Sequence, residues 1–122
     1  MGWKEKYIRL ALMLYELGCF VMDSDYLGYC LQTDNIKAVI YIRSSLSWKH
    51  KLYTLAHETG HLFRVSPEKP LVLNWTKMAS EEKANARAIE ILKLLEVDRH
   101  GYTMFYNEIK LRNKKKSWHQ YN

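Results

Sequence analysis

The run His-Glu-Thr-Gly-His at residues 57–61 constrains the fold of this chain more than any other feature of its sequence. Two histidines four residues apart lie on one face of an α-helix, so one metal ion can reach both imidazoles. A glutamate directly after the first histidine lies beside the pair, where it can act on a water as general base. The pattern is typical of zinc hydrolases, in which three protein ligands leave a fourth position open. We therefore expect a helix over about residues 47–64, with His57 and His61 as metal ligands and Glu58 as the catalytic residue.

The residues around this run favour a packed helix over a chance match on a solvated helix face. At about 100° per residue, one stripe lies nearly opposite the two histidines. Its members are Trp48, Leu52, Leu55, Ala56, Thr59, Leu62 and Phe63. Gly60 costs about 1 kcal/mol relative to alanine inside a helix. The glycine therefore predicts that a neighbouring element requires a small residue there.

A third metal ligand is expected from the next helix, over about residues 80–97. The metzincin class requires a histidine six residues after His61, and Pro67 at that position excludes it. The next helix offers two carboxylates, Glu81 and Glu82. Glu81 lies on the apolar stripe of that helix, whereas Glu82 is rotated from it by about 100°. Because an inward-facing carboxylate is costly unless it is paired or metal-bound, we favour Glu81 over Glu82.

Other polar residues are assigned lesser roles. Asn85, one turn after Glu81, can hydrogen-bond a ligand and hold its orientation. His50 is too far along the helix axis, by about 10 Å, to share the ion, and we expect it at the surface. Four residues are weak candidates for stabilising a transition state: Tyr53, His100, Tyr102 and Tyr106. We expect each of them to lie in the packed core or at the surface instead.

The motifs together resemble the ImmA/IrrE-type zinc metallopeptidases. The resemblance rests on a strand at residues 38–42, on Leu-Ala directly before the histidine motif, and on Glu-x-x-Ala-Asn at residues 81–85. It covers about residues 36–95 and implies a minimal gluzincin-like fold, with His57, His61 and Glu81 holding Zn²⁺ and Glu58 as base. It also implies a cytoplasmic enzyme of bacteria, phages or mobile elements that cleaves a helix-turn-helix repressor.

Two classes of function follow from these observations. The leading interpretation is a zinc-dependent endopeptidase of narrow specificity whose partner is a protein substrate, a helix-turn-helix transcriptional regulator. The alternative is a non-catalytic protein-interaction module of a toxin–antitoxin or repressor pair that retains the metal site. The intact Glu58 disfavours the alternative, because a binding module has no chemical need for a general base.

Periodicity and turn residues predict an α+β fold, with a small antiparallel sheet packed on an N-terminal helix, the histidine-motif helix and the following helix. The N-terminal helix is expected to end at Gly18, a residue favoured just past helix ends. Asp23 to Asp25 are interpreted as a turn. The other expected elements are a helix over 3–17, a strand over 19–22, a hairpin of 27–32 and 36–43 joined at 33–35, an extended piece at 71–75 and a short helix over 102–112.

A chain of 122 residues is expected to form one domain, which we place at residues 1–112, followed by a basic tail at 113–122. The formal net charge is +6, and residues 101–122 hold five Lys/Arg against one Glu. A solvated tail explains this cluster better than contact with nucleic acid, which is the lesser interpretation.

Targeting and cysteine usage favour a cytoplasmic protein. The most apolar stretch, residues 7–22, is interrupted by Arg9 and Glu16, so no membrane partner is expected. The N-terminus is interpreted as the start of an amphipathic helix and not as a secretory signal. Cys19 and Cys30 form no C-x-x-C pair, which fits a reducing compartment with both thiols buried as small hydrophobes.

Overall fold

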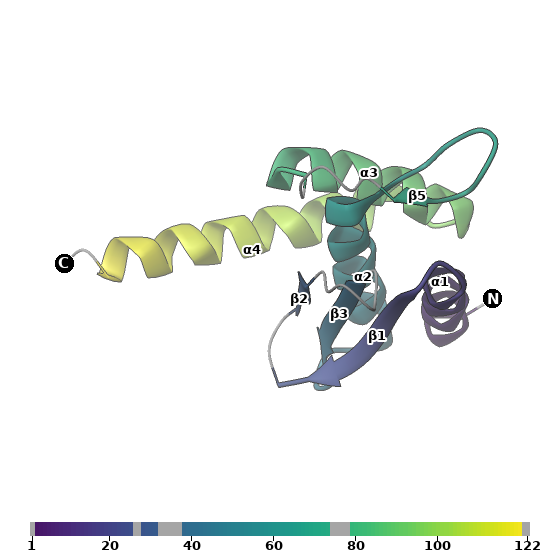
Figure 1. Cartoon of the computed structure of the whole chain (residues 1–122). Helices are drawn as coiled ribbons and strands as arrows, with labels where there is room; N and C mark the ends of the chain where they lie inside the picture. Colours follow the sequence, from purple (N-terminus) through teal and green to yellow (C-terminus); the bar gives the residue numbers. More distant parts are fainter. Residues whose placement is uncertain (1, 26–27, 32–37, 74–78, 121–122) are drawn as a thin grey trace.

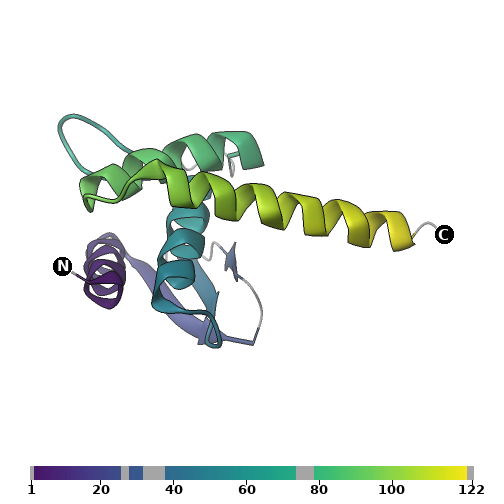
Figure 2. The ribbon, with the colours of Figure 1, turned by 180° about the vertical axis from the view of Figure 1, so that it is seen from behind.

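The computed structural model describes residues 2–25, 28–31, 38–73 and 79–120, with side chains for all of these except 28–31 and 112–120. The fold is a mixed α+β arrangement, as expected (Figure 1). Its elements are α1 (Trp3–Glu16), β1 (Cys19–Ser24), β2 (Gly28–Leu31), β3 (Ala38–Arg43), α2 (Trp48–Leu62), β4 (Phe63–Arg64), β5 (Val72–Leu73), α3 (Glu81–Leu94) and α4 (Arg99–Gln120). Helix α2 runs through the middle, with the sheet and α1 on one side and α3 and α4 on the other (Figures 1 and 2).

The main sheet has the strand order β1-β3-β2 and is mixed, so the expectation of an antiparallel sheet is wrong for one of its two pairings. β2 and β3 pair antiparallel, which confirms the expected hairpin strands, while the turn at 33–35 lies outside the described residues. β1 and β3 run parallel, from Cys19↔Ala38 to Ser24↔Arg43. Between β1 and β3 in the sequence, β2 runs in the opposite direction along the free edge of β3. The chain thereby comes back to the end of the sheet where β1 starts, and β3 begins at that same end. This pairing also extends β1 to Ser24, through two positions expected in a turn.

The central strand β3 explains why its sequence is so apolar. Four of its six residues are buried, Ala38, Val39, Ile40 and Ile42. Helix α2 packs on β3, and α1 packs on β1 and α2. α1 contributes its stripe of Tyr7, Leu10 and Leu14 to this core. Burial on both sides favours β-branched residues in a central strand.

The ends of α1 and α2 follow the local chemistry of their sequences. Gly18, directly after α1, has φ +82°, a left-handed conformation that glycine adopts without strain. Ser47 caps α2, because its hydroxyl accepts a hydrogen bond from the His50 N–H at 3.2 Å. Both outcomes confirm the expected helix limits, to within one residue for α1 and two for α2.

The contact between α2 and α3 depends on Gly60. A Cβ atom built on Gly60 would collide with the carbonyl oxygen of Ala84 and lie 3.1 Å from its carbonyl carbon. The backbones of the two helices therefore cross at a distance that only glycine allows. This confirms the prediction that a neighbouring element requires a small residue at position 60.

Helix α4 is longer than expected. It begins three residues before the expected helix and continues to Gln120, across the expected boundary at 112/113. The Asp98 carboxylate accepts a hydrogen bond from the His100 N–H at 3.0 Å and so supports an earlier start. Gly101 lies inside the helix, and the Tyr53 hydroxyl occupies the space where a Cβ of any other residue would be. The C-terminal part of α4 extends away from the rest of the molecule (Figures 1 and 2).

The cysteine of β1 and the apolar character of the helices bear on two further expectations. Cys19 is fully buried, and burial raises the pKa of its thiol to about 12, as expected of a small core hydrophobe. Among the described residues, no helix has the length and apolar character needed to cross a membrane.

Candidate metal centre

Three side chains from α2 and α3 meet at one point. His57 Nε2 lies 2.8 Å from Glu81 Oε2, and His61 Nε2 lies 3.2 Å from Glu81 Oε1. The ligand atoms of these three residues all lie within 4.8 Å of one another, a grouping that could hold a metal ion. The structure therefore brings together the residues expected to bind the ion, and Glu81, not Glu82, supplies the carboxylate.

Local contacts fix the start of α3 against the histidine face of α2. The Ser80 hydroxyl caps α3 by accepting from the Lys83 N–H at 3.3 Å, which makes Glu81 the first residue of the helix. The Ala79 N–H donates to the His61 carbonyl oxygen at 2.8 Å. Arg87, further along α3, donates to the carbonyl oxygen of Gly60 at 3.3 Å. These bonds hold Glu81 beside the two imidazoles.

Hydrogen bonds on the far side of each ring determine which nitrogen carries the proton. His61 Nδ1 lies 2.7 Å from the Ala79 carbonyl oxygen, which can only accept, so His61 is protonated on Nδ1. His57 Nδ1 lies 2.9 Å from Asn85 Oδ1, and it donates there in the same way. A ring that is neutral in this arrangement directs its Nε2 lone pair at the Glu81 carboxylate. Asn85 lies where the orienting role expected of it requires.

Lone pairs facing a carboxylate at these distances require a cation. Either a proton on Nε2 or a metal ion between the three groups removes the repulsion. Ligand atoms bound at about 2.0–2.2 Å to a tetrahedral ion are about 3.3 Å apart. The N–O distances of 2.8 and 3.2 Å, to the two oxygens of Glu81, are close to that value, and the whole set of ligand atoms lies within 4.8 Å of one another. The donor set of two imidazoles and one carboxylate thus fits a metal ion.

The exposure of Glu81 differs from what the sequence indicated. Its side chain is 63% exposed, whereas those of His57 and His61 are 15% and 8% exposed. The desolvation argument for choosing Glu81 was therefore wrong, although the residue itself is the one in the group. The carboxylate lies at the open side of the site, because Glu81 starts its helix and protrudes from the helix end. Solvent reaches the site from that side.

Glu58 lies half-buried beside the three candidate ligands. The net effect raises the pKa of its carboxyl: burial raises it most, the charges of His57 and His61 lower it, and the charge of Glu81 raises it. A carboxyl whose pKa is raised binds a proton more readily than an exposed glutamate does.

Helix α4 contributes two tyrosines, Tyr102 and Tyr106, to the surroundings of His57. Tyr102 is 1% exposed, donates its hydroxyl proton to Asn85 Oδ1 at 2.5 Å and lies 3.1 Å from His57 Nδ1. Burial, followed by the charges of Tyr106, Glu81 and Glu58, raises the pKa of Tyr102 far above its usual range, so the hydroxyl stays protonated. The Tyr106 ring stacks on His57, with centroids 5.6 Å apart. No local pattern relates residues 45 positions apart, so the sequence held no indication of these contacts.

The remaining candidates lie elsewhere. The Tyr53 ring is buried against Tyr102, with centroids 5.8 Å apart, and its hydroxyl points to Gly101. His100 is exposed at the start of α4. His50 is also exposed, as expected, and lies against Phe105 with ring centroids 4.8 Å apart.

Comparisons of the chain with known protein families, curated proteins and solved structures give no match. The resemblance to ImmA/IrrE-type metallopeptidases stays a prediction. The geometry of the site is therefore the basis on which function is argued.

Proposed function

We propose that this chain is a zinc-dependent endopeptidase of narrow specificity with a gluzincin-like fold, acting in the cytoplasm. The observation that carries the proposal is the orientation of the two imidazoles. Both Nδ1 atoms are held by acceptors, Asn85 Oδ1 and the Ala79 carbonyl oxygen, so that both Nε2 atoms face the Glu81 carboxylate. Two nitrogens and one oxygen around an open side favour zinc among the common divalent ions.

Zinc, when bound, would polarise a substrate carbonyl and lower the pKa of a coordinated water to near 7. The side chains supply the remaining chemistry. Glu58, between the two ligands on α2, accepts the proton of the attacking water and delivers it to the nitrogen of the leaving amine. Its raised pKa suits both steps, because the carboxyl must bind the proton before it releases it. Asn85 and Tyr102 hold His57 in one tautomer throughout.

The proposed substrate is a helix-turn-helix transcriptional regulator, as the resemblance of the motifs implies. The exposed Glu81 side supports a protein substrate, because an extended backbone can reach the site from solvent. The motifs place such an enzyme in a bacterium, a phage or a mobile element.

The test is cleavage by wild type and by Glu58→Gln. Each purified protein is loaded with one equivalent of zinc and incubated with the helix-turn-helix regulator encoded beside it, and fragments are identified by mass spectrometry. Wild type should cut at one or a few sites, and Glu58→Gln should bind zinc normally while losing at least about 100-fold of the rate. An unchanged rate in the variant would remove the proposed mechanism. An uncut regulator that binds the zinc-loaded wild type would instead favour the non-catalytic module.

A further inference from the structure

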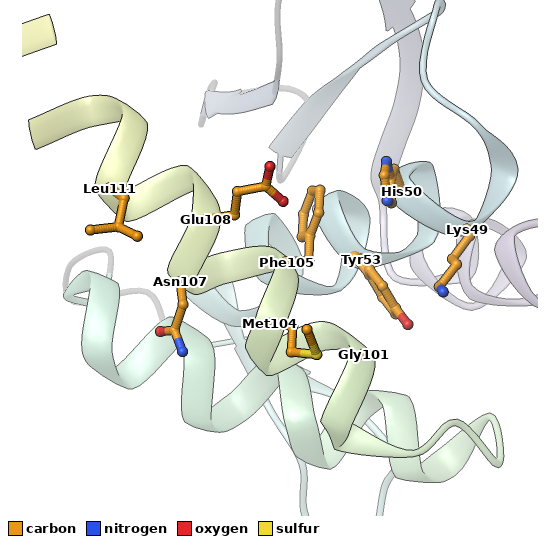
Figure 3. Close-up of a pocket in the computed structure, with 9 residues that line it drawn as sticks. All are labelled: Lys49, His50, Tyr53, Gly101, Met104, Phe105, Asn107, Glu108 and Leu111. Carbon is orange, nitrogen blue, oxygen red and sulfur yellow. The ribbon is translucent and has the colours of Figure 1, made fainter. Parts of the chain in front are cut away.

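A groove runs between α2 and α4, outside the candidate metal centre (Figure 3). Its volume is about 490 Å³. It is lined by Lys49, His50, Tyr53, Gly101, Met104, Phe105, Asn107, Glu108 and Leu111. In Figure 3, Lys49 lies at one end of the groove and Leu111 lies at the other.

The α4 side of this groove carries an apolar stripe open to solvent. Met104 and Leu111 are each 61% exposed, and between them Phe105 is half-buried. The floor is aromatic, because Phe105 lies 5.5 Å from the Tyr53 ring and 4.8 Å from the His50 ring. Stripes at this helical spacing beside an aromatic floor are typical of grooves that bind a partner's amphipathic helix.

Helix α4 as a whole is strongly basic, whereas the groove itself is lined by one lysine, Lys49, and one carboxylate, Glu108. Helix α4 contains six Lys/Arg, and Glu108 is its single Asp or Glu, so this helix carries a formal +5. At the other end, Lys49 Nζ lies 5.6 Å from the Trp3 ring and 6.0 Å from the Tyr53 ring. A ligand that spans the groove and continues along α4 is therefore favoured by negative charge near Lys49 and near the basic part of the helix, away from Glu108.

The extension of α4 gives a second reason to expect a partner. Twenty-two helical residues span about 33 Å. Both ribbon views show the C-terminal part of α4 leaving the body of the molecule (Figures 1 and 2). A helical segment without tertiary packing is marginal in water, and adjacent like charges weaken it further. A helix of opposite charge lying along α4 would supply both packing and compensation.

We infer that the groove between α2 and α4 is the docking site for an acidic amphipathic helix of a partner protein. The partner's apolar side chains lie against Met104, Phe105 and Leu111, and its negative charge is complementary to Lys49 and to the net positive charge of α4. A second copy of this chain fits poorly, because its α4 has the same charge. Single-stranded nucleic acid would meet the positive charge but leave the exposed apolar stripe unused. The groove shares no residue with the metal centre, so the inference does not depend on the proposed function.

The experiment selects binders from a displayed library of random 16-residue peptides against the full chain. Enriched sequences should be acidic, with apolar residues at i, i+3 or i+4, and i+7. Synthesised peptides from these sequences, labelled for fluorescence anisotropy, should gain helix content on binding. Met104→Glu and Leu111→Glu should each weaken their binding at least tenfold, because each places a carboxylate opposite the acidic ligand.

Leu12→Glu is the matched control, since Leu12 is 58% exposed on α1, away from the groove. It should leave peptide affinity unchanged, and circular dichroism melting should show all three variants folded. The inference is overturned if no acidic amphipathic peptide is enriched, or if the groove variants bind as wild type does. Two further results also overturn the inference. The first is a 20-nucleotide single-stranded DNA that binds more tightly than the peptides, with an affinity that Met104→Glu does not change. The second is a dimer, detected by sedimentation, that Leu111→Glu dissociates.

Discussion

The crossing of α2 and α3 at Gly60 makes a quantitative prediction for Gly60→Ala. The new Cβ would meet the carbonyl group of Ala84, which is backbone and can move only with α3. Overpacking of this kind costs about 1–3 kcal/mol, and a backbone obstacle places the cost near the upper end. The higher helix propensity of alanine stabilises the helix by about 1 kcal/mol and offsets part of this cost. We expect a net loss of about 2 kcal/mol in the free energy of unfolding.

Displacement of α3 should also disturb the metal centre, because Glu81 is the first residue of that helix. Urea unfolding is followed by circular dichroism after zinc has been removed by a chelator. The change in the free energy of unfolding then reports helix packing without a contribution from metal binding. With a slope of about 2 kcal/mol/M, the midpoint should fall by about 1 M. Zinc affinity, measured separately by competition with a chromophoric chelator, should fall as well.

Gly2→Ala is the control for this prediction. A Cβ built on Gly2 meets nothing within 4 Å, and the φ of −78° at this position suits any residue. We expect a change below about 1 kcal/mol and an unchanged zinc affinity. If Gly60→Ala is as stable as wild type and binds zinc equally well, the close crossing does not position the site, and the reasoning fails.

Two further predictions concern hydrogen bonding and pH. Asn85→Ala should weaken zinc binding about 10–100-fold in the chelator competition, because His57 loses the acceptor that fixes its tautomer; equal affinity would show that Asn85 does not orient the ligand. Burial, with a smaller contribution from Asp23, raises the pKa of Tyr7 from 10.0 to about 12. The stabilising contribution of its neutral form is therefore complete below pH 10 and is lost as the pH rises from 10 towards 12. Urea midpoints between pH 9 and 11 should fall less steeply in Tyr7→Phe than in wild type, and parallel curves would contradict this assignment.

The sequence predicted best what depends on neighbouring residues. The period of the apolar stripe placed α2, and Ser47 and Ser80 are the side chains that cap α2 and α3. The costly glycine at position 60 indicated a close contact before its partner, Ala84, was known. His57 and His61 share a face of α2 because they are four residues apart, while Glu81 joins them through the packing of α3 on α2.

What the sequence could not show depends on residues far apart in the chain. The parallel pairing of β1 with β3 is a matter of strand order, which local periodicity does not encode. Glu81 was chosen for a buried stripe but lies exposed at a helix end, a position that the average pattern of the helix does not reveal. Tyr102 reaches His57 only because α4 folds back over α2 and α3.

The length of α4 was missed for a different reason. Its basic C-terminal residues have the composition of a solvated tail, and charge repulsion disfavours an isolated helix. The helix nevertheless continues to Gln120. Composition predicted the charge of this segment but not its backbone conformation.

The central claim is that His57, His61 and Glu81 hold one metal ion. The most direct test is zinc affinity and stoichiometry, measured by competition with a chromophoric chelator, for wild type, Glu81→Gln and Glu82→Gln. The two variants remove the same charge from adjacent positions on α3, so their difference reports ligation alone. We predict one zinc per chain in wild type, an affinity at least about 100-fold lower in Glu81→Gln, and no change in Glu82→Gln. Equal affinities in all three proteins, or no zinc bound by wild type, would contradict the account.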